Sequence, residues 1–224
     1  MHPADGIDQE KRLAAEAAAL LVDDHMRVGL GTGSTVSHLL PVLAARRLDV
    51  VCVATSPTTA ALARGLGLAV APFDHLARLD IAIDGADQVA PDFWLIKGGG
   101  GAHTREKIVA CAAERFVVIV SSDKLVDRLT GPVPLELLGF GLEATRRSIG
   151  SDAACKLRSA PPTPDGGVLA DYTGEIEDPH ALACRLAATA GVVEHGLFPP
   201  RLVSEVVVAR QGQVEHLYPT SSPT

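Results

Sequence analysis

The strongest constraint on the fold is the alternation of short apolar runs with segments of helical periodicity. Runs that predict buried strands lie at 28–30, 50–54, 68–70, 80–83, 94–96 and 116–120. Helical patterns lie between them, at 7–24, 36–47, 58–66 and 104–115, although Pro41 should kink or break the second helix. Continuous apolar strands that alternate with helices are typical of a mainly parallel α/β sheet with helices on both faces. In such sheets, ligands bind outside the carboxyl ends of the strands.

The regular alternation of strand and helix patterns ends after Gly131. Prolines flank a strand pattern at 132–138, and a turn-rich break at 161–167 precedes a strand at 168–172 and a helix at 180–190. These patterns predict a smaller α+β unit. The apolar run 203–209 can supply a strand that rejoins the first sheet, and residues 221–224 are expected to form a frayed tail.

Composition limits the classes of partner. The chain has 224 residues, of which 47% are hydrophobic, so it can bury a substantial core. Its net charge of −7 argues against nucleic acid, because phosphate backbones require clustered Lys and Arg. Small anions remain possible ligands, since an acidic protein can still have a locally positive binding site. No apolar run approaches the roughly 18–20 residues that cross a bilayer, so we expect no membrane partner.

The cysteines and the first residues indicate the cytoplasm. The four cysteines form no CxxC pair, and a disulfide framework or zinc knuckle is not indicated. The first 19 residues contain acidic side chains among alanines, unlike a secretory signal. The eight histidines show no HExxH or HxH spacing, so no metal is assigned. His103 alone lies within a motif, where a surface or supporting role is favoured over catalysis.

The first candidate loop is Gly29–Thr35, GLGTGST, between a predicted strand and helix. It lacks the third glycine and the later acid of a dinucleotide loop, and it lacks the Gly-Lys-Ser/Thr of a Walker A loop. A phosphate cradle and a structural turn with a helix cap remain equally open.

A second candidate region combines acids, a cation and glycines. Asp84 and Asp87 end a buried strand with Gly85 and Ala86 between them, an arrangement that also suits a simple Asx turn. The next strand runs into Lys97 and four glycines, 98–101. Because ordering consecutive glycines costs much backbone entropy, this run favours a functional need for close backbone approach.

Two charged residues follow the glycines. Glu106 stands in the first turn of a helix for which Thr104 is the expected N-cap. Its carboxylate could simply compensate the helix dipole, worth about 0.3–1 kcal/mol, or could reach a ligand held by the loop amides. Lys124, after the strand at 116–120, would otherwise be an ordinary solvated lysine.

Taken together, these segments resemble the type A ribose-5-phosphate isomerases. The ordered blocks are GLGTGST at 29–35, DGAD at 84–87, IKGGGG at 96–101, TREKI at 104–108, KLV at 124–126 and GVVEHGLF at 191–198. The KGGG block followed by REK is highly specific to that family, whereas the first glycine loop alone is not. The resemblance covers about residues 11–198.

The resemblance implies a function and a fold. It implies interconversion of D-ribose 5-phosphate and D-ribulose 5-phosphate through an enediolate, in the non-oxidative branch of the pentose phosphate pathway, without metal or redox cofactor. It implies a Rossmann-like domain of residues 1–131 with 202–224, and an inserted α+β, ferredoxin-like lobe of residues 132–201. A homodimer or homotetramer is usual.

The resemblance also implies residue roles. Glu106 would be the general base, Lys97 would stabilise the enediolate, and Asp84 or Asp87 would assist ring opening and hydroxyl proton transfer. Ser34 and Thr35 would hold the phosphate, with help from Lys11. The full set of substrate-binding residues would be Lys11, Thr32, Gly33, Ser34, Thr35, Asp84, Gly85, Ala86, Asp87, Lys97, Gly98, Gly99, Gly100 and Lys124.

Three departures from the family pattern keep alternatives open. Gln88 stands where the family usually has Glu, His103 replaces an apolar residue, and 164–167 reads PDGG in place of the usual turn. A paralogue acting on a related pentose phosphate, a relative among sugar-phosphate deaminases and coenzyme A transferases, and a non-catalytic sugar-phosphate sensor are the alternatives. Retention of all four catalytic candidates argues against the sensor.

Overall fold

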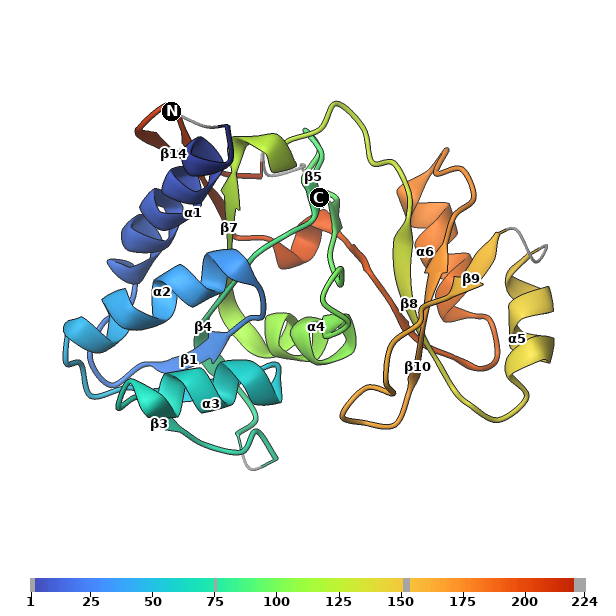
Figure 1. Cartoon of the computed structure of the whole chain (residues 1–224), viewed down its shortest axis with the longest axis horizontal. Helices are drawn as coiled ribbons and strands as arrows, with labels where there is room; N and C mark the ends of the chain where they lie inside the picture. The colour runs from blue at the N-terminus through green and yellow to red at the C-terminus, as the bar shows by residue number, and fades with distance from the viewer. Residues whose placement is uncertain (1–2, 75, 151–153, 220–224) are drawn as a thin grey trace. The chain divides into compact units, whose positions relative to one another are not determined.

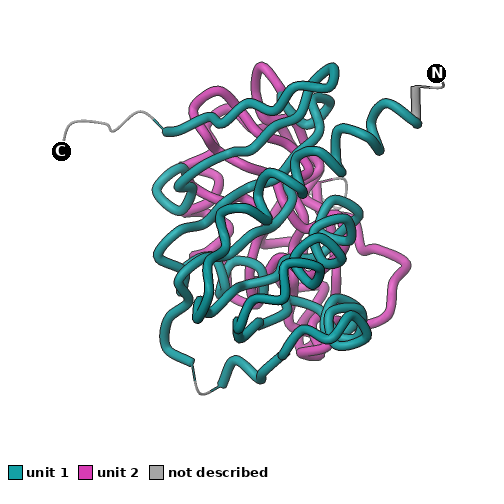
Figure 2. The backbone as a smooth tube through the Cα atoms, turned by 90° about the vertical axis from the view of Figure 1, so that its left-hand side faces the viewer, with its two compact units in different colours: residues 1–86, 105–125, 200–224 teal, residues 87–104, 126–199 magenta. Residues whose placement is uncertain are grey.

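The computed structural model describes residues 3–74, 76–150 and 154–219, so the predicted tail at 221–224 lies outside the described residues. The chain forms two compact units (Figure 2). Unit 1 comprises Met1–Ala86, Arg105–Leu125 and Pro200–Thr224, and unit 2 comprises Asp87–Thr104 and Val126–Pro199. The domain boundaries expected from the sequence stay a prediction, because compactness alone does not show which segments fold independently.

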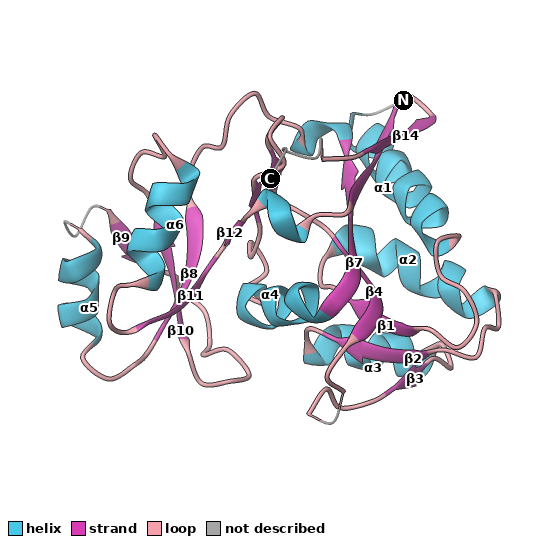
Figure 3. Ribbon diagram, turned by 180° about the vertical axis from the view of Figure 1, so that it is seen from behind, coloured by secondary structure: helices cyan, strands magenta, loops and turns pink. Residues whose placement is uncertain are grey.

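Unit 1 is built on a seven-stranded sheet with the order β14-β13-β7-β4-β1-β2-β3 (Figures 1 and 3). Its strands are β1 (Arg27–Leu30), β2 (Val51–Ala54), β3 (Ala69–Val70), β4 (Leu79–Asp84), β7 (Ala113–Ser121), β13 (Glu205–Arg210) and β14 (Gln213–Leu217). Every pairing is parallel except that of β13 with β14. The predicted mainly parallel sheet is confirmed, and the 203–209 run rejoins it as β13.

Helices cover both faces of this sheet. The helices are α1 (Pro3–Ala19), α2 (Ser34–Ala45), α3 (Pro57–Gly65) and α4 (His103–Ala112). Val28 and Leu30 share a buried core with α1 and α2. Gly29 points to the opposite face, where an added Cβ would lie 2.5 Å from Val109 of α4. The alternation along β1 therefore places α4 opposite α1 and α2.

Pro41 does not break α2, contrary to expectation. The helix continues from Ser34 to Ala45 with Pro41 inside it. The proline ring is exposed, while Leu39, Leu40 and Leu43 are buried. Burial of these leucines against the sheet offsets the hydrogen bond that a proline cannot donate.

Unit 2 contains a four-stranded antiparallel sheet with the order β11-β8-β10-β9. The strands are β8 (Val133–Leu137), β9 (Cys155–Leu157), β10 (Val168–Tyr172) and β11 (Val192–His195). Helices α5 (Leu142–Ile149) and α6 (Pro179–Ala187) bury Ile149 and Leu186 in one core with alternate residues of β8. The predicted α+β lobe is confirmed, although β9 and α5 were not foreseen.

A small three-stranded sheet in unit 2 corrects another expectation. The run at 94–96 becomes β6 (Leu95–Ile96), which pairs antiparallel with β5 (Gln88–Val89) and β12 (Leu197–Phe198). It is not a strand of the parallel sheet, so Lys97 does not follow a strand of that sheet, as the sequence had suggested. A two-residue strand provides too short a ladder for sequence to decide its partner.

Among the described residues, no helix is both long and apolar enough to span a membrane.

Candidate active site

The loop after β1 is packed against the end of β4. A Cβ on Gly31 would lie 1.9 Å from Cγ of Asp84, so only glycine allows this approach. The backbone N–H of Thr32 donates to Oδ1 of Asp84 at 3.1 Å, and that of Gly85 donates to the same atom at 2.7 Å. Asp84 is buried, with 3% of its surface exposed. These bonds fix one carboxylate oxygen at the carboxyl end of the sheet.

Threonine hydroxyl groups also hydrogen-bond to the loop after β1. The Thr32 hydroxyl lies 2.8 Å from the Thr55 hydroxyl, and the Thr59 hydroxyl donates to the carbonyl of Gly31 at 3.0 Å. Thr55 and Thr59 are both buried and were not identified from the sequence. Thr55 and Thr59 reach the loop only because β2 and α3 fold beside β1. The sequence signalled this position only by having Thr55 where a dinucleotide-binding loop would have an acid.

The start of α2 suits an anion. Its N-cap is Gly33, with φ of 131° and no side-chain cap, and its first turn contains no acidic residue. The ammonium of Lys11 donates to the hydroxyl of Ser34 at 3.0 Å. Thr35 follows in the same turn. Exposed N–H groups, the positive end of the helix dipole and a lysine together favour the phosphate cradle over a simple capped turn.

Helix α1 also holds the loop that carries Lys124. This residue ends the 3₁₀ turn η1 (Ser122–Lys124), and its ammonium lies 3.4 Å from Oδ2 of Asp123. Oε2 of Glu10 accepts the Ser122 N–H at 2.8 Å and the Ser122 hydroxyl at 2.7 Å. Burial raises the pKa of Glu10, but these hydrogen bonds outweigh it and hold the pKa below its usual range. Sequence reasoning missed Glu10, which is adjacent to Lys11.

Glu106 lies in the first turn of α4 and is 4% exposed. The helix begins at His103, so Thr104 is inside it and not the predicted N-cap. The Thr104 hydroxyl donates to Glu136 instead. His103 is fully buried, so of the two expected roles the surface role is wrong and the supporting role stays a prediction. Its Nε2 lies 3.4 Å from the carbonyl of Glu194.

The glycine loop, residues 98–101, needs its glycines for steric reasons. Gly98 and Gly101 have φ of 102° and 76°, a region that L side chains rarely adopt. An added Cβ would meet His103 at 2.7 Å from Gly98, Asp87 at 2.8 Å from Gly99, and Leu169 at 2.5 Å from Gly101. Oδ2 of the exposed Asp87 accepts the Gly99 N–H at 2.7 Å. The predicted close approach to the backbone is therefore present within the protein, and the functional need for it stays a prediction.

Lys97 enters this loop from a buried position. It is 2% exposed, and its ammonium lies 5.4 Å from the ring centroid of Phe198. Its N–H donates to the carbonyl of Gly196 at 2.9 Å, and a Cβ on Gly196 would lie 2.2 Å from the Lys97 carbonyl. The family-like segment 191–198 thus fixes the backbone of Lys97.

The structure brings some predicted residues together within each unit. In unit 1, Thr32 meets Asp84 and Lys11 meets Ser34. In unit 2, Asp87 meets Gly99. The joint action of the full predicted set on one substrate stays a prediction. Across the described ranges, no group of three His, Cys, Asp or Glu is arranged to hold a metal ion.

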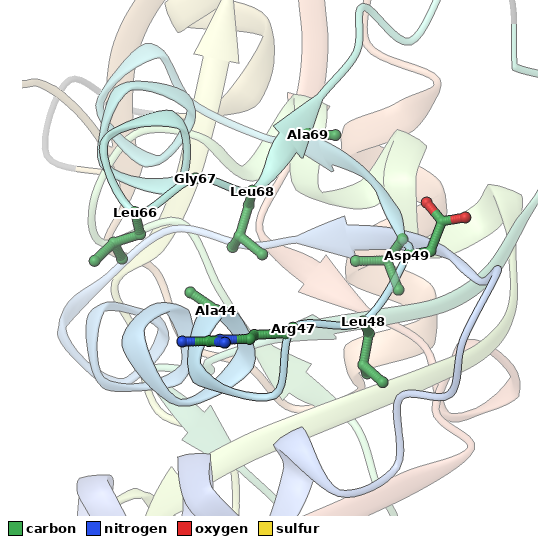
Figure 4. Close-up of a pocket in the computed structure, with 9 residues that line it drawn as sticks. Ala44, Arg47, Leu48, Asp49, Leu66, Gly67, Leu68 and Ala69 are labelled. Atoms are coloured by element: carbon green, nitrogen blue, oxygen red, sulfur yellow. The ribbon is translucent and has the colours of Figure 1, made fainter.

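A pocket of about 480 Å³ in unit 1 lies elsewhere (Figure 4). It is lined by Ala44 near the end of α2, by residues 47–50 after that helix, and by residues 66–69 after α3. These segments lead into β2 and β3, so the pocket is at the amino ends of those strands. None of the predicted site residues lines it.

Comparison with known proteins identifies the family. The sequence model of ribose 5-phosphate isomerase A (phosphoriboisomerase A) matches residues 51–213. Ribose-5-phosphate isomerase A of Roseiflexus sp. (strain RS-1) is 44% identical over 219 residues, covering 92% of this chain and 94% of that protein. The enzyme of Caulobacter vibrioides is 43% identical, covering 95% and 99%.

Solved structures agree with the sequence comparison. Ribose 5 phosphate isomerase A from Neisseria gonorrhoeae superposes with a TM-score of 0.90 and 31% identity, covering 96% of this chain and 98% of that one. The Methanocaldococcus jannaschii enzyme gives a TM-score of 0.87 and 34% identity, covering 93% and 97%. This chain therefore belongs to the ribose 5-phosphate isomerase A family.

Proposed function

We propose that this isomerase interconverts D-ribose 5-phosphate and D-ribulose 5-phosphate in the non-oxidative branch of the pentose phosphate pathway. Family membership over nearly the whole chain supports this activity. The glycine loop is the observation that carries it: three of its four glycines have no room for a side chain, and it follows a buried lysine. Such a loop offers backbone donors and a cation to an oxyanion.

Glu106 acts as the base in this proposal. It takes the proton bound to C2 of the open-chain aldose, the C–H electrons form the C1=C2 double bond, and O1 becomes an oxyanion. O1 then gains a proton and O2 loses one. Glu106 returns its proton to C1, which leaves the ketose with its carbonyl at C2. The carboxylate in the first turn of α4 suits this shuttle, because it can accept the carbon-bound proton and return it.

The remaining residues bind and stabilise. Lys97 and the amides of Gly98, Gly99 and Gly100 stabilise the enediolate, while Asp84 or Asp87 assists ring opening and proton transfer between O1 and O2. Ser34, Thr35, Lys11 and Lys124 bind the phosphate at the start of α2, and Thr32, Gly33, Gly85 and Ala86 complete the binding set. No step requires a metal or redox cofactor.

The protein acts in the cytoplasm as a homodimer or homotetramer, without a nucleic acid or membrane partner. Its four free cysteines suit a reducing compartment, and its net negative charge opposes binding to polyanions. Sedimentation of the purified chain would determine the oligomeric state. A monomer at all concentrations would contradict the proposed homodimer or homotetramer.

A coupled assay with ribose 5-phosphate in the presence of a chelator tests the proposed function. We expect ketose formation at an unchanged rate, because every proposed catalytic group is an amino-acid side chain or backbone amide. A folded protein that turns over another pentose 5-phosphate but not this one would indicate a paralogue. Binding without turnover of any pentose phosphate would instead indicate a sensor.

A further inference from the structure

We propose that Arg158 is a positioning residue that aims the backbone N–H groups of the glycine loop at the reacting oxygen. This inference rests on the proposed function, since it assigns that loop to enediolate stabilisation. Arg158 follows β9 in unit 2, and its side chain is 18% exposed. No local motif surrounds it, and sequence reasoning did not single it out.

The guanidinium of Arg158 joins a carboxylate to the loop backbone. Its Nη1 donates to the carbonyl of Gly98 at 3.0 Å and to that of Gly99 at 3.1 Å. Its Nε and Nη2 donate to the two carboxylate oxygens of Asp171 at 2.9 and 2.6 Å. Asp171 is held in β10 between β8 and β9. A planar guanidinium with five donors can make all four contacts, whereas a lysine ammonium has three donors and no fork.

These contacts determine which way the loop amides point, together with the hydrogen bond that the Gly101 N–H donates to the Gly98 carbonyl at 3.0 Å. In a planar trans peptide, the carbonyl and the N–H point in opposite directions. The Gly98 carbonyl shares its peptide with the Gly99 N–H, and the Gly99 carbonyl shares its peptide with the Gly100 N–H. Holding both carbonyls on Arg158 therefore turns both N–H groups away from it. The Gly99 N–H accordingly reaches Asp87 at 2.7 Å.

Arg158 also strengthens and orders these donors. A cation at the carbonyl side polarises each peptide and makes its N–H a better donor. Asp171 balances the charge of the guanidinium. Glycine backbone is otherwise the costliest to order, and donors fixed before the reaction need no reorganisation when charge develops. Arg158 therefore acts through the loop, as a positioning residue for the amides that stabilise the transition state.

The test compares Arg158→Lys and Asp171→Asn with a control in the same lobe, Arg146→Gln. Arg146 also joins a carboxylate, Glu143 at 2.8 Å, to a backbone carbonyl, Cys155 at 3.3 Å, and these two partners belong to α5 and β9. We would measure kcat and KM for ribose 5-phosphate, and hydrogen exchange of the Gly99 amide. The amide measurement needs no turnover, so it separates this inference from the proposed function.

Arg158→Lys should lower kcat by about tenfold to a hundredfold, the range for losing charge-assisted hydrogen bonds, and change KM by less than about threefold. Hydrogen exchange of the Gly99 amide should accelerate in Arg158→Lys. Asp171→Asn should also lower kcat and accelerate this exchange, by smaller factors. Arg146→Gln should leave kcat and the exchange rate unchanged. Wild-type kcat and exchange in Arg158→Lys, or an equal loss in the control, would overturn the inference. If Arg158→Lys does not fold, the same comparison rests on Asp171→Asn, and wild-type values there would overturn it.

Discussion

Thr32 and Asp84 are joined by a backbone hydrogen bond of 3.1 Å, which holds the loop after β1 against the last residue of β4. Gly31 makes this bond feasible, because any side chain there would occupy the volume of the Asp84 carboxylate. Sequence places these residues more than 50 positions apart, and the parallel pairing of β1 with β4 brings them together.

Gly31→Ala should lower both activity and stability. The added methyl would lie 1.9 Å from Asp84 Oδ1, so the loop or the carboxylate must shift. Overpacking of this kind costs about 1–3 kcal/mol in the free energy of unfolding. Urea denaturation and kcat/KM would measure the two effects. Gly65→Ala, in open space on α3, is the control and should be neutral or stabilising. Equal values for both variants would contradict the steric account.

Glu106→Gln should retain substrate binding and lose turnover by at least about 10²–10⁴, the range typical of a lost general base. The amide keeps the size of the side chain but cannot accept a proton from carbon. In heavy water, wild type should introduce deuterium at C1 or C2 of the recovered sugar, and the variant almost none. Glu114→Gln, at an exposed position of β7, should behave as wild type. Wild-type exchange in Glu106→Gln would move the base to Asp84 or Asp87.

Lys124→Ala should raise KM for ribose 5-phosphate by about tenfold to a hundredfold, because one charge-assisted hydrogen bond to phosphate contributes about 1.5–3 kcal/mol. The effect on kcat should be small, since the phosphate does not react. Steady-state kinetics would measure both constants. Lys156→Ala, at an exposed position of β9, is a charge-matched control. An unchanged KM in Lys124→Ala would remove this lysine from the phosphate site.

Acid should weaken the link between β1 and β4 made by Arg27 and Asp80. Arg27 donates to both Asp80 oxygens, from Nη2 at 2.8 Å and from Nε at 3.1 Å. These side-chain hydrogen bonds, followed by one from the Arg27 backbone N–H, lower the pKa of Asp80. A carboxylate with a lowered pKa stabilises the fold above its unfolded pKa of about 3.9, and this contribution disappears as pH falls through the folded value.

Asp80→Asn should therefore lower Tm at neutral pH by no more than about 2–4 °C, because the pair is partly exposed to solvent, which screens it. The difference from wild type should shrink below about pH 4, where the wild-type carboxylate is also becoming protonated. Thermal unfolding across pH would test this, with the exposed Asp127→Asn as control. A Tm difference that stayed constant down to pH 2 would contradict the ionic origin.

The sequence by itself determined the classes of structure and the residue types of the site. Apolar runs such as 80–83 specify buried parallel strands whatever their partners, because their hydrophobicity on both faces is a local property. The four glycines at 98–101 likewise signalled a close approach, since their entropic cost is local too. The same local signals predicted the α+β lobe, although they did not indicate β9 or α5.

Only the tertiary structure decided which groups meet. The partners of β6 could not be foreseen because two residues make too few ladder bonds to specify a register. Pro41 is tolerated because leucines on the opposite side of α2 are buried, which is a property of packing. Glu10 and Arg158 act on loops 112 and 59–60 residues away in sequence. A hydrogen bond across such a separation leaves no periodic or local pattern, so it exists only once the strands have placed both ends.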